Sequence, residues 1–217
     1  DFSITDEGTY WSITGIGGKA YDLNHNLLCD GKSYAQEWWF EHRQKVKPTD
    51  FYVPTGPELH TIIRTLYENR EGKYKTIIET VRQQLQEWFK SYYLMTLSRI
   101  DYKTTGNDEV VHYQDKPVPI DIVGPDGLIK NIHPDNELKE LLGAKDWQEV
   151  QETYKWTTKL DSYFYRLNNK PTSQTSRALV LGIYYDIFDV DADYFGDRPA
   201  VGVRRAKKSS TGNEETK

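Results

Sequence analysis

The sequence ALVLGIYYDIFDVDADYF, residues 178–195, decides the fold of this chain of 217 residues. β-branched and aromatic residues dominate the stretch, which favours strands over a helix. Asp189, Asp191 and Asp193 alternate with apolar residues, and this period of two places the three carboxylates on one face of an extended strand. The pattern therefore predicts sheet structure near the C-terminal end of the chain, with an acidic strand face.

The longest helical pattern lies upstream of this stretch, at about residues 73–94. Its apolar side chains recur at helical spacing and its charged side chains fall mostly on the opposite face. The apolar stripe comprises Tyr74, Ile77, Ile78, Val81, Leu85, Trp88, Phe89 and Tyr92. A helix with one apolar face buries that face against another layer of structure.

Shorter helices are predicted from their start signals. Ser33 with Gln36 and Thr55 with Glu58 have the spacing of a capping box, and Asp146 is an N-cap for a helix over 147–156. A further helix is expected over 136–142.

The remaining segments are typical of strands and turns. Asn24 to Asn26 lie between two short apolar runs, as in a hairpin turn, and Thr104 to Asp108 join two strand-like runs. A last strand is expected in 200–206. Strands and helices alternate without a regular βαβ order, which predicts an α+β fold with a mainly antiparallel sheet and a helical layer on one face.

Chain length and composition indicate one domain. A chain of 217 residues and 25.4 kDa can bury a stable core without disulfides. We expect a single α+β domain over 1–206 and a disordered tail over 207–217, whose sequence KKSSTGNEETK holds no apolar anchor.

Charge and cysteine content exclude several classes. A net charge of −5 disfavours a general polyanion binder, although the basic segment 204–208 keeps a nucleic-acid-binding module as an alternative. Cys29 is the only cysteine, so no internal disulfide forms, and a reducing, cytoplasmic location is expected. No stretch approaches the roughly 20 apolar residues of a membrane helix. The chain begins at Asp1, consistent with either a processed product or an excised piece.

The acidic stretch is the densest group of candidate metal ligands. Asp186, Asp189, Asp191 and Asp193 could bind calcium or magnesium, which prefer carboxylate oxygens. The stretch lacks the glycine and glutamate of the calcium-loop consensus, so a solvated face or pairing with nearby arginines such as Arg198 is the other interpretation. With a metal bound, the cluster would suit a hydrolase or phosphoryl-transfer enzyme.

Aromatic residues suggest a binding function. The chain has 16 Tyr and 6 Trp, and the histidines show no zinc-binding spacing. Trp38 and Trp39, with Glu41 and His42 on the same predicted helix, could form the wall and polar edge of a pocket. We therefore expect a binding protein whose aromatic surface takes a protein or small-molecule ligand, with the metal-dependent enzyme and the nucleic-acid module as alternatives.

Overall fold

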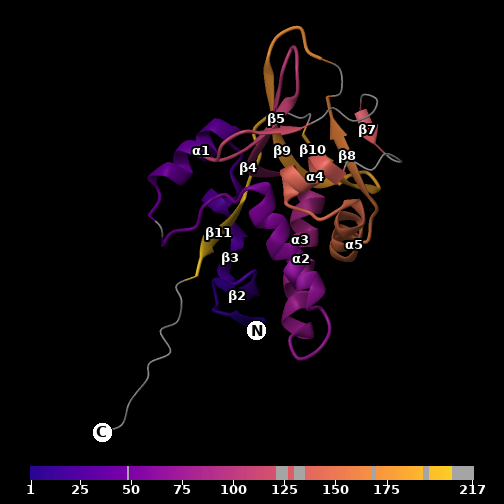
Figure 1. The fold of residues 1–217 in the computed structure, drawn as a ribbon. Coiled ribbons are helices and arrows are strands. Elements are labelled where there is room, and N and C mark those ends of the chain that lie inside the picture. Colours follow the sequence, from indigo (N-terminus) through magenta and orange to yellow (C-terminus); the bar gives the residue numbers. More distant parts are fainter. Residues whose placement is uncertain (48, 121–126, 130–134, 168–169, 193–195, 207–217) are drawn as a thin grey trace.

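The computed structural model of the chain describes residues 1–217 except 48, 121–126, 130–134, 168–169, 193–195 and 207–217. Two sheets, mostly antiparallel, and several helices form an α+β fold, as the sequence predicts. Figure 1 shows the helices α2 and α3 between the N-terminal strands and the later sheet. Within the described residues, no helix combines the length and the apolar character needed to cross a membrane.

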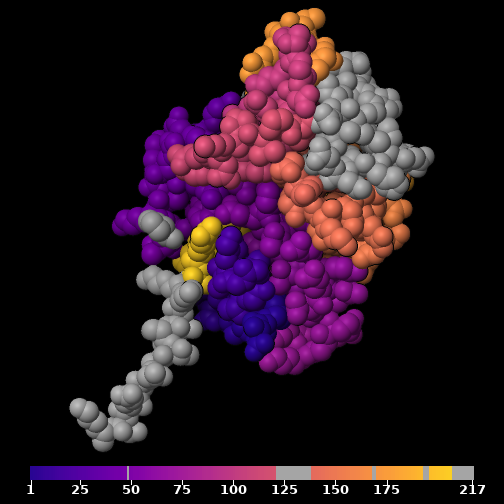
Figure 2. Space-filling view, in the orientation of Figure 1, coloured from indigo at the N-terminus to yellow at the C-terminus, as the bar shows by residue number. Residues whose placement is uncertain are grey.

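The smaller sheet joins the two ends of the described chain. Its strands run in the order β1-β2-β3-β11, and β11 pairs antiparallel with β3. Their bounds are β1 (Ser3–Asp6), β2 (Tyr10–Ile16), β3 (Lys19–Leu27) and β11 (Val201–Arg205). In Figure 2 the yellow C-terminal strand lies directly against the indigo N-terminal segment. A 3-10 turn, η1 (Leu28–Gly31), follows β3.

The larger sheet has the order β6-β5-β4-β9-β10-β8-β7. Its strands are β4 (Leu94–Tyr102), β5 (Asp108–His112), β6 (Val118–Ile120), β7 (Gly127–Ile129), β8 (Ser162–Arg166), β9 (Thr175–Tyr184) and β10 (Ile187–Asp191). Neighbouring strands are antiparallel except β8 and β10, which run parallel. Residues 178–191 therefore lie in a central hairpin, β9–β10.

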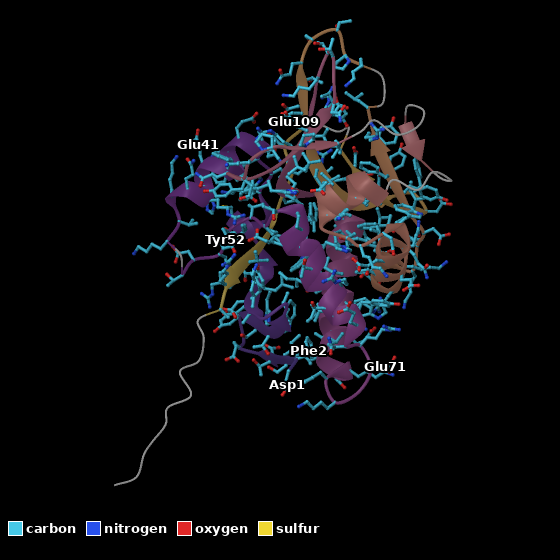
Figure 3. The ribbon with its side chains drawn as sticks, viewed as in Figure 1. Asp1, Phe2, Glu41, Tyr52, Glu71 and Glu109 are labelled. Carbon is cyan, nitrogen blue, oxygen red and sulfur yellow. The ribbon has the colours of Figure 1, made fainter. Side chains whose placement is uncertain are left out.

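Helices cover one face of the larger sheet. They are α2 (Gly56–Glu68), α3 (Lys75–Ser91), α4 (Asp135–Leu142) and α5 (Trp147–Thr158). Phe188 of β10 packs edge-on against Phe89 of α3 and is stacked on Tyr154 of α5, with ring centroids 5.1 and 4.2 Å apart. α2 and α3 also contact the smaller sheet, so both sheets and the helical layer share one main core. Phe2 and Glu71 are both labelled at the lower end in Figure 3, where the ring of Phe2 meets that of Tyr74 edge-on, with centroids 5.6 Å apart.

A second, smaller core lies on the opposite face of the larger sheet, under helix α1 (Gln36–Lys45). It is centred on Trp39, which is completely buried. Its other buried members are Leu28, Val53, Met95, Leu97, Ala178, Val180 and Ala200. The predicted helical layer on one face is thus confirmed, and α1 covers part of the other face.

Helix boundaries follow the start signals in part. The Thr55–Glu58 capping box and the Asp146 N-cap are both present. The Ser33–Gln36 capping box is wrong, because α1 begins after Ala35 without a side-chain cap and Gln36 instead donates to the carbonyl oxygens of Thr96 and Ser98. The long helix spans Lys75–Ser91, and Leu94 already belongs to β4.

Two further predictions concern turns and the tail. The hairpin turn at Asn24–Asn26 is wrong, because β3 continues through it and the chain turns at Gly17 and Gly18, both with positive φ. The turn near Gly106 is confirmed between β4 and β5. The tail over 207–217, expected to be disordered, lies outside the described residues.

Candidate functional site

A pocket of about 490 Å³ opens on the sheet face opposite the main helices, beside α1. It combines three tyrosines, two aspartates and an arginine. Its described lining residues are Tyr93, Tyr165, Tyr184, Ile187, Asp189, Asp191 and Arg198, and we call it the tyrosine pocket. They come from four strands or their ends and from the segment before β11.

Strand alternation places the two aspartates in this pocket. Phe188 and Val190 are completely buried in the main core, so Asp189 and Asp191 project from the other face of β10. In the parallel pairing with β8, Asp191 lies beside Tyr165. The predicted shared face of Asp189 and Asp191 is confirmed by this register, but both side chains are buried, at 5% and 7% exposure, rather than open to water.

A glycine allows a tyrosine to cover Asp189. Gly182 of β9 pairs with Asp189, and a Cβ atom at Gly182 would lie 3.0 Å from the ring of Tyr93. The absence of a side chain there lets the Tyr93 ring lie against the strand. Its hydroxyl donates to Asp189 Oδ2 at 3.0 Å. The other oxygen, Oδ1, is buried and accepts no hydrogen bond from the residues that the structure describes.

The surroundings of Asp189 favour its protonated form. Burial, followed by repulsion from Asp191, raises the pKa of Asp189 to about 7, and the hydrogen bond from Tyr93 opposes the rise only partly. Burial and the nearby Asp189 also raise the pKa of Tyr93, so its hydroxyl stays a donor at neutral pH. Asp189 therefore changes charge near neutrality. A carboxyl group of this kind can accept a proton, donate one or bind a cation.

Exposed aromatic side chains surround Arg198. The backbone of Arg198 pairs with that of Tyr34, and the Tyr34 ring is stacked on Trp38 with centroids 3.8 Å apart. A smaller hollow, of about 340 Å³, is lined by Arg198 together with Tyr92 and Tyr93. Trp38, Tyr92, Tyr184 and Tyr185 are the large apolar side chains with the greatest exposure in the described part of the chain. We call this group, with the tyrosine pocket at its centre, the aromatic surface.

The four residues predicted to form a binding wall do not share one pocket. Trp39 points into the second core, and its indole Nε1 donates to the carbonyl oxygen of Arg198 at 2.9 Å. Trp38 and His42 lie side by side on the outer side of α1, with ring centroids 5.3 Å apart. Glu41 is exposed, pairs with Lys45 and lines a different groove. Of the four residues, Trp38 is the one that is exposed and also contacts the ring of Tyr34.

The four predicted metal ligands also separate. Asp189 and Asp191 meet in the tyrosine pocket, whereas Asp186 is exposed in the β9–β10 turn. Asp193 lies outside the described residues. Among the residues that the structure does describe, no group of three or more His, Cys, Asp and Glu side chains is placed to hold a metal ion.

A second groove, of about 510 Å³, runs beneath α1. Phe40, Leu97 and Tyr113 form its apolar part, and Glu37 and Glu41 stand at its edge on the exposed side of the helix. Its acidic residues are exposed, so water solvates their charges. The tyrosine pocket differs because it holds a nearly buried carboxyl group whose Oδ1 has no hydrogen-bond partner, and we regard it as the better candidate site.

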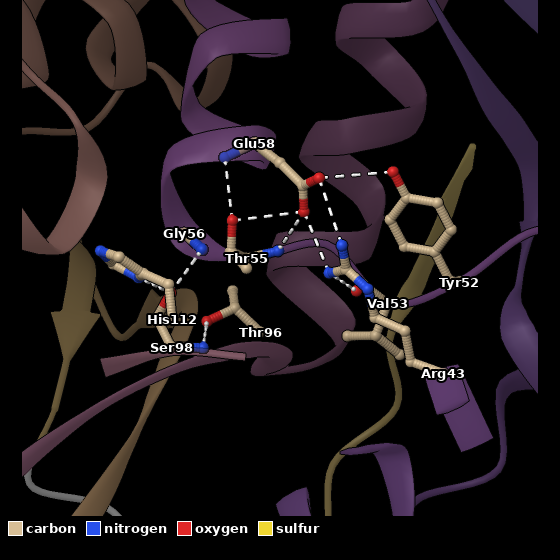
Figure 4. A network of polar contacts seen from close by, with 9 residues as sticks. All are labelled: Arg43, Tyr52, Val53, Thr55, Gly56, Glu58, Thr96, Ser98 and His112. Atoms are coloured by element: carbon tan, nitrogen blue, oxygen red, sulfur yellow. Dashed lines mark hydrogen bonds and ion pairs between the residues drawn. The ribbon is translucent and has the colours of Figure 1, made fainter. Parts of the chain in front are cut away.

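A Ser–His pair elsewhere in the structure has a structural role. Ser98 Oγ and His112 Nδ1 are 2.6 Å apart, which resembles a nucleophile and its base. Ser98 is completely buried, however, and its Oγ accepts from the backbone N–H of Gly56 at 2.8 Å. His112 Nε2 lies 2.6 Å from the carbonyl oxygen of Glu140. Figure 4 shows Ser98 between the start of α2 and His112. Because Ser98 is completely buried, its hydroxyl is not accessible to a substrate.

The same figure shows the ion pair that fixes α1 to α2. Arg43 donates to both carboxylate oxygens of Glu58, at 3.1 and 3.4 Å, and its guanidinium lies between the rings of Tyr52 and Tyr113. Both charged side chains are about 15% exposed. In a largely buried pair of this kind, removing either partner leaves the other charge without compensation and destabilises the folded protein.

We expect Glu58→Gln to lower the free energy of unfolding by about 2 kcal/mol, because it leaves Arg43 half-buried without its counter-charge. Glutamine keeps the capping box, so the helix start is preserved. Urea unfolding measures the change. Glu41→Gln, which removes the exposed pair with Lys45, is the matched control and should change stability by less than about 0.5 kcal/mol. Equal effects from the two variants would show that the Arg43–Glu58 pair contributes no more to stability than the exposed Lys45–Glu41 pair.

Sequence reasoning missed Tyr93, Tyr165 and Tyr184, and it named Arg198 only as a partner for the aspartates. The segment SYFYR alternates aromatic and other residues with the same period of two as the aspartates, and this signal marks Tyr163 and Tyr165 as one strand face. It does not reveal that β8 lies parallel to β10, since the two strands are separated by β9 in the sequence.

The chemistry of the pocket has to be interpreted from its own residues. Its two buried carboxyl groups and its tyrosine walls make it the candidate site, and they name no particular activity. Comparison with known proteins finds no family model, no curated protein and no solved structure that is similar to this chain.

Proposed function

We propose that this protein is a binding protein, with its ligand held in the tyrosine pocket and contacted by the aromatic surface around it. The observation that carries the proposal is Asp189, a carboxyl group that is 5% exposed and lines a pocket of about 490 Å³. Its Oδ1 has no hydrogen-bond partner in the described part of the chain. Buried polar atoms are normally hydrogen-bonded. A ligand that donates to Oδ1 would satisfy it.

The exposed aromatic residues support the same interpretation. Tyr184 and Tyr185 are 53% and 85% exposed. Tyr184, the last residue of β9, lines the pocket, and Tyr185, the next residue, lies against the Tyr184 ring with centroids 4.5 Å apart. Tyr185 also has a positive φ of 53°, which is unfavourable for a bulky side chain. Exposed tyrosines give a large contact area with little loss of conformational entropy, and they are frequent anchors in binding sites.

A ligand-observed NMR experiment tests the proposal. The probes are benzylamine, benzyl alcohol, benzoate and glucose, which differ in charge and in aromatic character. We expect at least one probe to bind, and Tyr184→Ala to weaken its binding at least about ten-fold because one wall of the pocket is removed.

Glu41→Ala provides the matched control, since Glu41 lines only the groove beneath α1. Binding should be the same in this variant as in the wild type. The proposal is contradicted if no probe binds, or if Glu41→Ala abolishes binding and Tyr184→Ala leaves it intact.

The second candidate is a divalent-metal-dependent enzyme, favoured by the two buried carboxyl groups on one strand face. It requires calcium, magnesium or manganese to raise the melting temperature, and Asp191→Asn to abolish the rise. If metal ions leave the melting temperature unchanged and an organic probe binds, the results favour the first candidate.

A further inference from the structure

We propose, on the basis of the proposed function, that the ligand carries a protonated amine whose ammonium group lies against Asp189 and Asp191. Its organic part would lie among Tyr93, Tyr165 and Tyr184. This deepens the proposed function by naming the chemical class of the ligand.

The position of the two carboxyl groups supports an ammonium ion. Oδ2 of Asp189 already accepts from Tyr93, which leaves Oδ1 as the acceptor without a partner. Asp191 lies two residues along the same strand and lines the same pocket. An ammonium group supplies several N–H donors and a positive charge at once, and charge-assisted hydrogen bonds are the stronger kind.

The walls of the pocket suit a cation as well. Three tyrosine rings line it, and the face of a tyrosine ring attracts a cation. Two aspartates and one arginine are the charged side chains among its described lining residues, so the pocket carries one net negative charge when both aspartates are ionised. A monovalent organic cation neutralises that charge, whereas an anion would meet two carboxylates.

A neutral hydroxyl ligand and a metal ion fit less well. A hydroxyl donates one hydrogen bond and brings no positive charge to offset the repulsion of Asp189 by Asp191. A bare divalent ion prefers six or more oxygen ligands, and the described pocket offers two carboxylates in largely aromatic surroundings.

The ionisation of Asp189 gives the inference a distinctive signature. The groups facing it are Asp191 on its own strand, Tyr93, Tyr165 and Tyr184 on the neighbouring elements, and Arg198. Since its pKa is about 7, Asp189 is mostly neutral at pH 6 and mostly ionised at pH 8. An amine that remains protonated over this range should therefore bind more tightly at the higher pH.

Titrations of benzylamine, benzyl alcohol and benzoate by protein NMR at pH 6 and pH 8 test this inference. We expect the Kd of benzylamine to fall about ten-fold from the lower to the higher pH, following the ionised fraction of Asp189. Benzyl alcohol should bind more weakly with no such change, and benzoate should not bind. Shifted resonances should belong to the tyrosine pocket.

Two variants complete the experiment. Asp189→Asn should weaken benzylamine binding at pH 8 and remove its pH dependence, whereas Asp186→Asn, in the exposed turn, should change neither. If benzyl alcohol binds in the pocket as tightly as benzylamine, or if Asp189→Asn keeps the pH dependence, the ammonium assignment is overturned while the binding function stands. If none of the three compounds, nor glucose, binds the pocket, both fail.

Discussion

Asp189→Asn is expected to stabilise the folded protein, by about 2–4 kcal/mol at pH 8. In the folded state the pKa of Asp189 is about 7, well above the value of an exposed aspartate. Between these two values the folded state binds more protons than the unfolded state, so stability falls as the pH rises through this range. Asparagine has no charge to bury, and its amide oxygen can still accept from Tyr93.

The measurement is urea unfolding of the wild type and of Asp189→Asn at pH 5 and pH 8. The gain in stability should be larger at pH 8, where the buried Asp189 of the wild type is ionised, than at pH 5, where it is protonated. Asp186→Asn is the matched control, since Asp186 is exposed in the adjacent turn and should leave stability unchanged. A loss of stability in Asp189→Asn would mean that the carboxylate makes favourable contacts in the folded protein, against our account.

Trp39→Ala is expected to lower the free energy of unfolding by about 3–5 kcal/mol, whereas Trp38→Ala should lower it by about 1 kcal/mol. Trp39 is completely buried at the centre of the second core and donates to the carbonyl oxygen of Arg198. Trp38 is 38% exposed and is stacked between Tyr34 and His42. Thermal and urea unfolding of the two variants provide the comparison.

The neighbouring tryptophans should also differ in how they affect the pocket. Trp39 fixes the carbonyl of Arg198, so Trp39→Phe, which keeps the core filled, should lose about 1 kcal/mol and shift the NMR resonances of Arg198. Trp38→Ala should leave those resonances in place. Similar losses of stability from the two alanine variants would contradict the assignment of one tryptophan to the core and the other to the surface.

The sequence predicted those features that depend on local periodicity. The α3 stripe from Ile78 to Phe89, the Thr55–Glu58 capping box and the alternation of Asp189 and Asp191 are each encoded within a few residues, and all three are present. Tyr92, which the pattern placed in the stripe, follows the helix and is exposed. The Ser33–Gln36 start failed because Gln36 forms hydrogen bonds to Thr96 and Ser98, about 60 residues away. Such a tertiary contact has no signal in the local pattern.

The candidate site was harder to predict than the fold. Alternation showed that Asp189 and Asp191 share a face, but burial of that face depends on Tyr93, which can cover Asp189 only because Gly182 lies opposite. The parallel neighbour β8 and the segment containing Arg198 complete the pocket from other parts of the chain. Helical spacing likewise grouped Trp38 with Trp39, although one faces outwards and the other faces the sheet.

The central proposal is that Asp189, a buried carboxyl group with a raised pKa, binds a cationic ligand. Its most direct test is an NMR titration of the Asp189 carboxyl carbon in the wild-type protein, first alone and then with saturating benzylamine. Our account predicts a midpoint at about pH 7 in the free protein and a markedly lower midpoint with benzylamine bound. A midpoint near that of an exposed aspartate in the free protein, or one that benzylamine does not lower, would contradict it.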